Sequence, residues 1–352
     1  MFRVHALRHC SFTISRPGTM NIRCMNTRGG RLTLTSVFCV LLIIIVTYNQ
    51  LVYDVIVEEL DVLRYKYQAG RTKYICCDMS GGLGNLLFQY TFTLAMSLRF
   101  NMTMVCETDK IHTIQQIFDI PDCADDNRGF RLCFGERAIT NKFNVGYDSK
   151  VGNMLLEDDT HFIGYFQSWL YWIKYEDTIK ERLTMKSDLK ASAKSYIEAC
   201  LHELGVETRS SVSLVGVHVR RGDLLNYKFR WYGYFVAPEE YFHKAMAYIT
   251  KRVRKPVVYV ISSNDMEWSR AAVKATNAVF LLNNTREFDF AVLTMCDHFI
   301  MSVGTFGWWV GWHIQGIVIY YLKPFRPDSG LSRVTTNDYV TTFAYPKWIG
   351  MS

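Results

Sequence analysis

Gly216-Val217-His218-Val219-Arg220-Arg221-Gly222-Asp223 is the most informative stretch of this 352-residue chain. The apolar run at residues 212–217 is short, β-branched and followed by a charged loop, which predicts a buried parallel strand. In an open α/β sheet, ligands bind just outside the carboxyl ends of the strands. Two adjacent guanidiniums at that place are rigid donor forks that match phosphate oxygens. The alternative interpretation is a solvated loop in which Arg221 and Asp223 form a local ion pair.

The sequence that follows alternates between short apolar runs and helical patterns. Such an alternation predicts a parallel, Rossmann-like sheet covered by helices. The polar stretch 205–211 comes before it and is the expected boundary between two lobes. The expected strands are 212–219, 257–261, 278–282, 299–303 and 317–322, and the expected helices are 238–252, 266–276, 286–296 and 308–314.

Polar residues follow three of these strands. Because the carboxyl ends of parallel strands meet at one edge of the sheet, we expect the three clusters to lie together. They predict a pocket for a nucleotide diphosphate, with guanidiniums for charge, a helix-start hydroxyl and glycine N–H groups for phosphate, and a carboxylate or amide for a base edge. The clusters are His218, Arg220, Arg221 and Asp223; Ser262, Ser263, Asn264 and Asp265; and Ser302, Gly304 and Thr305.

A glycine loop opens the first lobe. The expected strand 73–78 is followed by Ser80-Gly81-Gly82-Leu83-Gly84-Asn85 and then by helical spacing over residues 86–100. This layout brings backbone N–H groups at a helix start close to an anion. The alternative is a tight turn that needs a positive φ. Leu87 stands where a dinucleotide-binding fingerprint requires a small residue, so that motif is not present.

The rest of the first lobe is less regular. We expect a strand within 101–107, a helix over 111–118 and a long helix over 176–204. Between them lies an aromatic run whose pattern favours a hydrophobic core, with a stacking platform for pyranose rings as the alternative. The run consists of Phe162, Tyr165, Phe166, Trp169, Tyr171 and Trp172.

Composition argues against nucleic-acid binding and against a metal site. A hydrophobic content of 49% in a chain of this length is sufficient for two cored domains. The net charge of +7 comes mainly from residues 1–31, which hold six arginines and no acid, so the remainder is near neutral. A near-neutral body argues against a nucleic-acid-binding face. The ten cysteines form no CxxC pair and no Cys/His cluster at zinc spacing, so we predict no metal site.

Residues 32–49 predict a membrane anchor. The apolar run within them is about 17 residues long, near the lower limit for a spanning helix. Arginines before it and acids after it orient a single-pass type II protein, with a cytoplasmic tail at 1–31 and a lumenal stem at 50–72. A cleaved signal peptide and a mitochondrial presequence are the alternatives.

This topology has consequences for the residues beyond the anchor. Asn101 and Asn283 would be N-glycosylation acceptors on the lumenal side. Seven cysteines follow the anchor, and some of them should form disulfides in a lumenal compartment.

Four segments stand in the order found in one enzyme family, and the chain resembles the α-1,2-fucosyltransferases over about residues 73–350. The His-x-Arg-Arg-x-Asp motif is shared with other fucosyltransferases, whereas the Gly-Thr-Phe-Gly-Trp segment and the opening glycine loop narrow the resemblance to this family. The segments are Ser80–Tyr90, His218–Asp223, Ser263–Trp268, and Asp289-Phe290-Ala291 through Ser302-Val303-Gly304-Thr305-Phe306-Gly307-Trp308.

The resemblance implies a two-lobed GT-B fold, with a first, acceptor-side lobe at 73–205 and a GDP-fucose-binding lobe at 206–352. It also implies an enzyme of the Golgi membrane that needs no metal or other cofactor. The reaction would transfer L-fucose from GDP-β-L-fucose, with inversion, to the 2-hydroxyl of a terminal galactose. Whether the chain forms a homodimer is left open.

The resemblance also implies roles for individual residues. Arg220 would be the main diphosphate ligand, with Arg221 as its structural partner held by Asp223. An inverting route needs a base for the acceptor hydroxyl, and Asp223, Glu267 and His218 are all candidates. The remaining expected contacts are His218 near the guanosine or the diphosphate; Asn264 or Asp265 with guanine or ribose; Ser302, Gly304 and Thr305 with phosphate; and Gly82, Gly84 and Asn85 closing over the donor from the first lobe.

Two other functions remain as alternatives. One is a fucosyltransferase that makes a different linkage or uses a different acceptor, as the shared Arg-Arg motif permits. The other is a GDP-sugar-binding or lectin-like protein that has the fold but no turnover.

Overall fold

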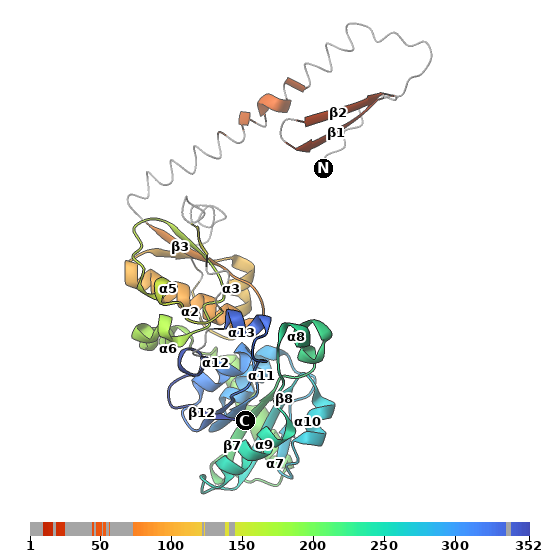
Figure 1. Cartoon of the computed structure of the whole chain (residues 1–352). Helices are drawn as coiled ribbons and strands as arrows, with labels where there is room; N and C mark the ends of the chain where they lie inside the picture. Colours follow the sequence, from red (N-terminus) through yellow and green to blue (C-terminus); the bar gives the residue numbers. More distant parts are fainter. Residues whose placement is uncertain are drawn as a thin grey trace. The chain divides into compact units, whose positions relative to one another are not determined.

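The structure is a computed structural model that describes residues 10–16, 19–24, 44–45, 47–50, 52–53, 56, 73–121, 123, 138–140, 145–335 and 339–352. The chain divides into two compact units, Met1–Ala69 and Gly70–Ser352. In the first unit, β1 (Cys10–Arg16) pairs antiparallel with β2 (Thr19–Cys24) (Figure 1). Within the described ranges, no helix is both long enough and apolar enough to cross a membrane. The expected tail, anchor and stem lie largely outside these ranges.

The second unit begins with a four-stranded parallel sheet in the order β4-β3-β6-β5. Its central strand β3 (Tyr74–Asp78) is buried over four of its five residues, as expected when both faces of a parallel sheet are covered. The neighbouring strands are β4 (Thr103–Val105), β6 (Thr160–Ile163) and β5 (Ala138–Thr140), and the helices α2 (Leu83–Phe100) and α3 (Thr108–Gln115) follow β3 and β4.

A six-stranded parallel sheet forms the other lobe, which confirms the predicted strand–helix alternation. Numbered along the chain, its strands stand in the order 3-2-1-4-5-6 of doubly wound Rossmann folds. The order reverses between the first and the fourth strand, and such a switch point is where these sheets bind ligands. The strands are β7 (Ser213–Val219), β8 (Val257–Ser263), β9 (Ala278–Phe280), β10 (His298–Met301), β11 (Val318–Tyr321) and β12 (Ile349–Met351).

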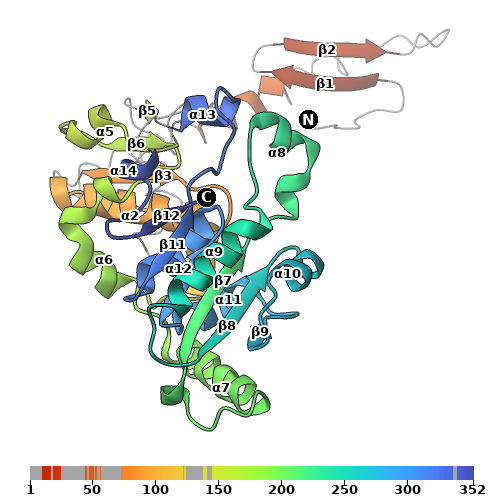
Figure 2. The same cartoon turned by 60° about the horizontal axis from the view of Figure 1, so that its bottom comes forward.

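Helices cover both faces of this second sheet (Figure 2). Alternate residues of β7 point to opposite faces, so Val215 and Val217 pack against α9 (Glu239–Thr250) while Leu214 packs with α7 (Ser187–Glu203). The face with α7 also carries α11 (Arg286–Thr294) and α12 (Thr305–His313). Two parallel sheets of this kind fit the GT-B arrangement expected from the sequence.

One hydrophobic core joins the two sheets. The ring of Phe88 on α2 lies 4.7 Å from that of Trp308 and 5.0 Å from that of Trp309, both on α12. Trp172 packs on the same two tryptophans. Most of the aromatic run around residues 162–172 is therefore core, as favoured from the sequence, and Tyr165 is its most exposed member.

Some expected elements differ from those observed. The expected helix 176–204 is two helices, α6 (Glu176–Arg182) and α7, because Met185 between them pairs with Phe118 in an antiparallel bridge. The strand β12 was not predicted, since three residues carry no readable period. A short helix, α8 (Tyr227–Tyr232), lies between the expected strand 212–219 and the expected helix 238–252, where no element was predicted. The other helices are α5 (Ser149–Asn153), α10 (Met266–Ala272), α13 (Gly330–Val334) and α14 (Tyr339–Thr342).

The cysteines pair in part, as expected. Cys106 and Cys123 form a disulfide that ties the loop after α3 to the end of β4, and Cys76 is also disulfide-bonded. Cys77, Cys200 and Cys296 are free thiols. Burial raises the pKa of Cys77 and of Cys296 well above the usual range, so both thiols are held in their unreactive neutral form.

Candidate functional site

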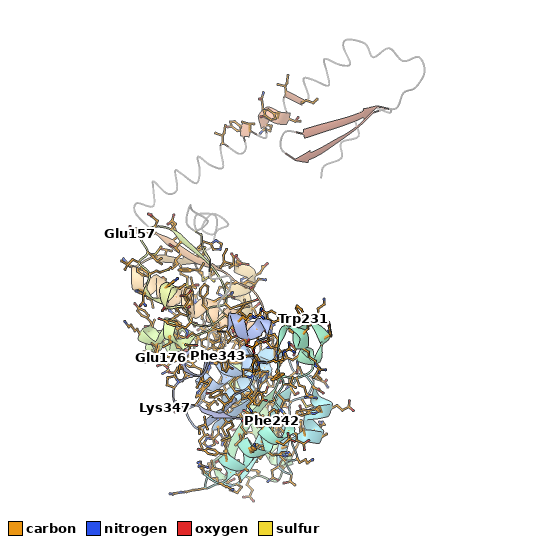
Figure 3. All side chains as sticks on the ribbon, in the orientation of Figure 1. Glu157, Glu176, Trp231, Phe242, Phe343 and Lys347 are labelled. Carbon is orange, nitrogen blue, oxygen red and sulfur yellow. A yellow bond between two sulfur atoms is a disulfide. The ribbon has the colours of Figure 1, made fainter. Side chains whose placement is uncertain are left out.

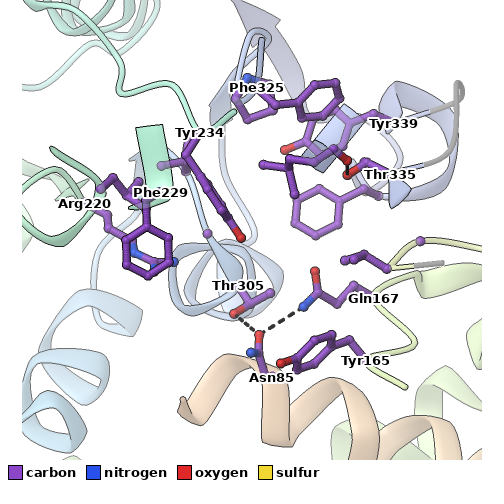
Figure 4. A pocket seen from close by; sticks show the side chains of 18 of the residues that line it. Asn85, Tyr165, Gln167, Arg220, Phe229, Tyr234, Thr305, Phe325, Thr335 and Tyr339 are labelled. Atoms are coloured by element: carbon purple, nitrogen blue, oxygen red, sulfur yellow. Dashed lines mark hydrogen bonds between the residues drawn. The ribbon is translucent and has the colours of Figure 1, made fainter. Parts of the chain in front are cut away.

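A cavity of about 290 Å³ lies between the carboxyl edges of the two sheets (Figure 4). The first lobe contributes Asn85 from the start of α2 and Tyr165 and Gln167 from the loop after β6. The second lobe contributes Arg220 from the loop after β7, and Gly304 and Thr305 from the turn after β10. The first-lobe residues follow the adjacent strands β3 and β6, and the second-lobe residues follow the adjacent strands β7 and β10. Each pair flanks the point where the strand order of its sheet reverses, which leaves room for a ligand.

Two helices start at this cavity without a capping side chain and without an acid in the first turn. α2 has Gly82 as its N-cap and α12 has Gly304, and neither glycine can supply a capping side chain. Neither helix has an acidic residue in its first turn. By contrast, α9, α10 and α11 each carry an acid in theirs. Free N–H groups and two helix dipoles therefore favour an anion here.

Arg220 adds a full positive charge at the same place. Its side chain is one third exposed, and its Nη2 atom lies 2.8 Å from Oδ2 of Asp223. Its backbone N–H donates to Oγ of the buried Ser302, which fixes the loop to the end of β10. Gly304 has a φ of 97°, and a Cβ there would stand 2.7 Å from Nη1 of Arg220. Glycine is therefore required both by the backbone and by the neighbouring guanidinium.

Asn264 holds the loop that carries Arg220. Its Oδ1 accepts the backbone N–H groups of Arg221 and Gly222, and its Nδ2 donates to Oδ1 of Asp223. Burial acts to raise the pKa of Asp223, but the hydrogen bonds and charge of Arg220 and the bond from Asn264 outweigh it, so the pKa lies below its usual range. Asp223 is therefore ionised at neutral pH and orients Arg220.

Arg221 does not pair with Asp223, contrary to the expectation. Its Nε atom lies 3.4 Å from Oδ2 of Asp265, and its guanidinium carbon stands 4.3 Å from the ring centre of Trp268. The reason is geometric, because successive side chains after a strand diverge: Arg220 turns toward the cavity and Arg221 toward α10. Asp265 also caps α10 by accepting a hydrogen bond from the backbone N–H of Trp268. Its carboxylate therefore holds both Arg221 and the start of α10.

His218 is buried and does not line the cavity. Its ring centre stands 5.0 Å from that of Phe306 on α12, and its Nδ1 has no hydrogen-bond partner within the described residues. Burial, aided by the charge of Arg220 and opposed by Asp223, lowers its pKa to about 3. The imidazole is therefore neutral at physiological pH.

Asn85 links the two lobes across the cavity. Its Oδ1 accepts hydrogen bonds from Nε2 of Gln167 at 3.0 Å and from Oγ1 of Thr305 at 2.8 Å (Figure 4). One residue earlier, a Cβ on Gly84 would stand 2.4 Å from the backbone of Thr305. Gly84 is therefore needed for close contact between α2 and α12, while Gly81, with a φ of 88°, makes the tight turn.

The structure thus places Asn85, Arg220, Gly304 and Thr305 together in the cavity wall. The other expected contacts surround these four: Arg221, Asp223, Asn264, Asp265 and Ser302 hold the loops, Gly82 and Gly84 shape the helix start, and His218 lies beneath. Their proposed roles toward a donor stay predictions. Both sequon residues, Asn101 and Asn283, are exposed.

Several functional positions were missed from the sequence. Gln167, Phe229 and Tyr234 line the cavity but stand in segments without a readable pattern. Tyr165 also lines it, and it belongs to the aromatic run for which a stacking platform was the alternative interpretation. Gln89 had a signal, as a polar residue in the middle of an apolar helix. It is buried, and its side-chain amide binds the backbone of Asp78, Ser80 and Gly164, thereby joining the ends of β3 and β6.

None of the three candidate bases is placed to act as one. Asp223 is ion-paired, which weakens it as a base. Glu267 is exposed on α10 and does not line the cavity, and neither does His218. Among the described residues that line the cavity there is no carboxylate. Over the same described part of the chain, no group of three or more His, Cys, Asp or Glu side chains converges as metal ligands.

The chain is similar to known proteins over part of its length. It is 32% identical over 195 residues to galactoside alpha-(1,2)-fucosyltransferase 1 of Saimiri boliviensis boliviensis, which covers 54% of this chain and 51% of that one. It is 31% identical over 193 residues to galactoside alpha-(1,2)-fucosyltransferase 2 of Bos taurus, covering 53% and 54%. The chain spans about half the length of these relatives.

A crystal structure of the fucosyltransferase NodZ from Bradyrhizobium is also similar, with 14% identity, a TM-score of 0.47 and coverage of 68% of this chain and 92% of that one. A family model covers far more of the present sequence than any of these pairwise matches. The model of glycosyl transferase family 11 matches residues 42–351, which include both sheets and the whole cavity, and the chain therefore belongs to that family.

Proposed function

We propose that this protein transfers L-fucose from GDP-β-L-fucose to the 2-hydroxyl of a terminal galactose, with inversion at the anomeric carbon. The observation that carries the proposal is the anion site made by Arg220 and the two uncapped helix starts, at the switch points of two facing sheets. The family and the names of the relatives supply the sugar, the linkage and the acceptor class.

The site is suited to a diphosphate leaving group. When the bond between fucose and phosphate breaks, negative charge develops on the departing GDP. The guanidinium of Arg220 and the first-turn N–H groups of α12 are already oriented, because Asp223, Ser302 and Gly304 fix the loops that carry them. Preorganised donors of this kind typically lower a barrier by about 3–4 kcal/mol each.

The opposite wall of the cavity is suited to a neutral sugar. Tyr165 offers a partly exposed aromatic ring, and Gln167 offers an amide whose Nε2 is held by Asn85. Rings and amides bind the apolar face and the hydroxyls of a pyranose. Because these residues come from the first lobe and Arg220 from the second, the acceptor sugar and the diphosphate would contact opposite walls of one cavity.

The proposal extends to location. Residues 32–49 would anchor the chain in the Golgi membrane with residues 70–352 in the lumen, and Asn101 and Asn283 would be glycosylated. The exposure of both asparagines and the disulfide between Cys106 and Cys123 support a lumenal position. The test is a glycosidase-sensitive mobility shift of the expressed chain that is lost in Asn101→Gln with Asn283→Gln.

The activity is tested by GDP release from GDP-fucose with the full chain in detergent, EDTA present, against a panel of terminal β-galactosides. We expect release that depends on a galactoside, and a product whose linkage analysis gives fucose on the galactose 2-hydroxyl. Another linkage would identify a different fucosyltransferase. Binding of GDP-fucose without release on any galactoside would favour the binding-protein alternative.

A further inference from the structure

A second groove lies beside the cavity, against α8. It measures about 820 Å³ and is lined by aromatic and aliphatic side chains together with three arginines. None of the described lining residues is acidic. We call this surface the α8 groove; its residues are Arg221, Leu224, Leu225, Tyr227, Arg230, Trp231, Tyr234, Phe235, Val236 and Arg326.

Its aromatic residues are unusually exposed. Trp231 is 69% and Tyr227 is 77% exposed, whereas Phe242, on the neighbouring helix α9, is fully buried (Figure 3). The sequence Tyr-Lys-Phe-Arg-Trp-Tyr gives a six-residue helix with aromatics on every side, so it cannot bury all of them in one core. Large exposed aromatic surfaces surrounded by polar groups mark binding sites.

The arginines of the groove differ in how far they are engaged. Arg221 is paired with Asp265, and Arg326 donates to the backbone carbonyl of Trp231. Arg230 forms no ion pair within the described part of the chain. A positive charge without a partner, beside an exposed indole ring, fits a ligand that combines a ring face with an anionic group.

The groove continues from the cavity. Leu224 and Tyr234 line both. On α8, Phe229 lies in the cavity wall (Figure 4), and the next two residues, Arg230 and Trp231, line the groove. If a terminal galactose occupies the cavity, the rest of its glycan must leave by an open path along the surface. The α8 groove adjoins the cavity at Leu224 and Tyr234, and its lining has arginines but no acid among the described residues.

We propose that the α8 groove binds an acidic sugar of the acceptor glycan, next to the terminal galactose, with Arg230 contacting its carboxylate or sulfate and Trp231 stacking on its ring. This inference rests on the proposed function. It makes Arg230 and Trp231 determinants of acceptor choice that do not touch the reacting atoms.

The test compares three β-galactosides whose second sugar is glucose, glucuronic acid or 6-sulfated glucose, so that the neutral, carboxylate and sulfate forms share one core. With the full chain, we expect KM for at least one acidic acceptor about tenfold below that for the neutral one, as a charge-assisted hydrogen bond would give. The acidic acceptor that has the lower KM shows whether the groove recognises a carboxylate or a sulfate. In Arg230→Gln the advantage should vanish, with kcat and the KM for GDP-fucose unchanged.

The matched control is Arg254→Gln, which changes an exposed arginine in the loop before β8, at the opposite edge of the sheet. It should preserve the preference for acidic acceptors. Trp231→Ala should raise KM for all three acceptors, because stacking does not depend on charge.

Equal KM values for the three acceptors, or a preference that survives Arg230→Gln, would overturn the inference. So would Trp231-dependent binding to anionic phospholipid vesicles with acceptor kinetics unchanged, which would make the groove a membrane contact.

If the wild-type chain released no GDP with any galactoside, the proposed function would fail on its own. Direct calorimetric titration with the glucuronate and sulfate disaccharides would then test whether the α8 groove binds an acidic sugar. Binding that is lost in Arg230→Gln supports it, and absent or Arg230-independent binding refutes it.

Discussion

The guanidinium of Arg220 and the carboxylate of Asp223 form a 2.8 Å ion pair, three residues apart on one loop. The same carboxylate receives a hydrogen bond from Asn264, whose other side-chain atom holds the backbone of Arg221 and Gly222. The pair is about one third exposed, so its main value is orientation and not stability. It points one charge of the Arg-Arg motif at the cavity, while the other is held against α10 by Asp265.

Asp223→Asn should lower kcat by about tenfold or more and leave folding largely intact, because asparagine keeps the shape but loosens Arg220. Arg220→Ala should cost about 10²- to 10³-fold in kcat, since it removes the charge itself. The measurement is steady-state GDP release, with circular dichroism to check folding. Asp265→Asn is the matched control: it loosens Arg221 instead, so it should lower thermal stability more than kcat. Equal losses of kcat in the two carboxylate variants would contradict this division of roles.

Asn85→Asp tests the electrostatics of the helix start. The substitution keeps the side chain's size but places a carboxylate between Gln167 and Thr305, at the positive ends of α2 and α12. The new charge would compete with the diphosphate for that site, so the KM for GDP-fucose should rise by about tenfold at low salt, with a smaller change at high salt. Asn85→Ser, which adds no charge, should affect donor KM much less. A donor KM that stays the same in Asn85→Asp would place the diphosphate elsewhere.

Gly84→Ala tests the contact between the two lobes. A Cβ at this position would stand 2.4 Å from the backbone of Thr305, and neither helix can move without disturbing the aromatic core around Phe88 and Trp309. We expect a loss of about 1–3 kcal/mol in the free energy of unfolding and a fall in activity. Gly82→Ala provides the comparison, because a Cβ there meets no atom within 4 Å. The contact would be refuted if both variants melted at the wild-type temperature.

The alternation of strands and helices after residue 212 could be predicted because each element carries its own period. The meeting of Arg220 and Thr305 at one edge of the sheet followed from that alternation, because the carboxyl ends of parallel strands lie together. The strand order, and with it the switch point, could not be read from the alternation. What could not be predicted depends on contacts between distant segments. The pairing of Arg221 with Asp265 is set by the direction in which each side chain leaves the loop, and Tyr165 and Tyr234 reach the cavity only because two lobes face one another. The break between α6 and α7 comes from a bridge to Phe118, which no local pattern records.

Buried His218 makes the stability of the protein depend on pH. Its pKa of about 3 in the folded chain lies below the usual value of 6.5, so the unfolded chain takes up a proton first as the pH falls. Stability is therefore full above about pH 6.5 and declines toward pH 3, by about 1.4 kcal/mol per pH unit for one such group. Burial also lowers the pKa values of His298 and His313, so part of the slope belongs to them. His218→Gln should make the free energy of unfolding in urea fall less between neutral pH and about pH 5 than it does in the wild type. Identical slopes would mean that His218 takes up its proton equally well in the folded and the unfolded chain. The protonated Nδ1 beside Phe306 would then need an acceptor, which none of the described residues supplies.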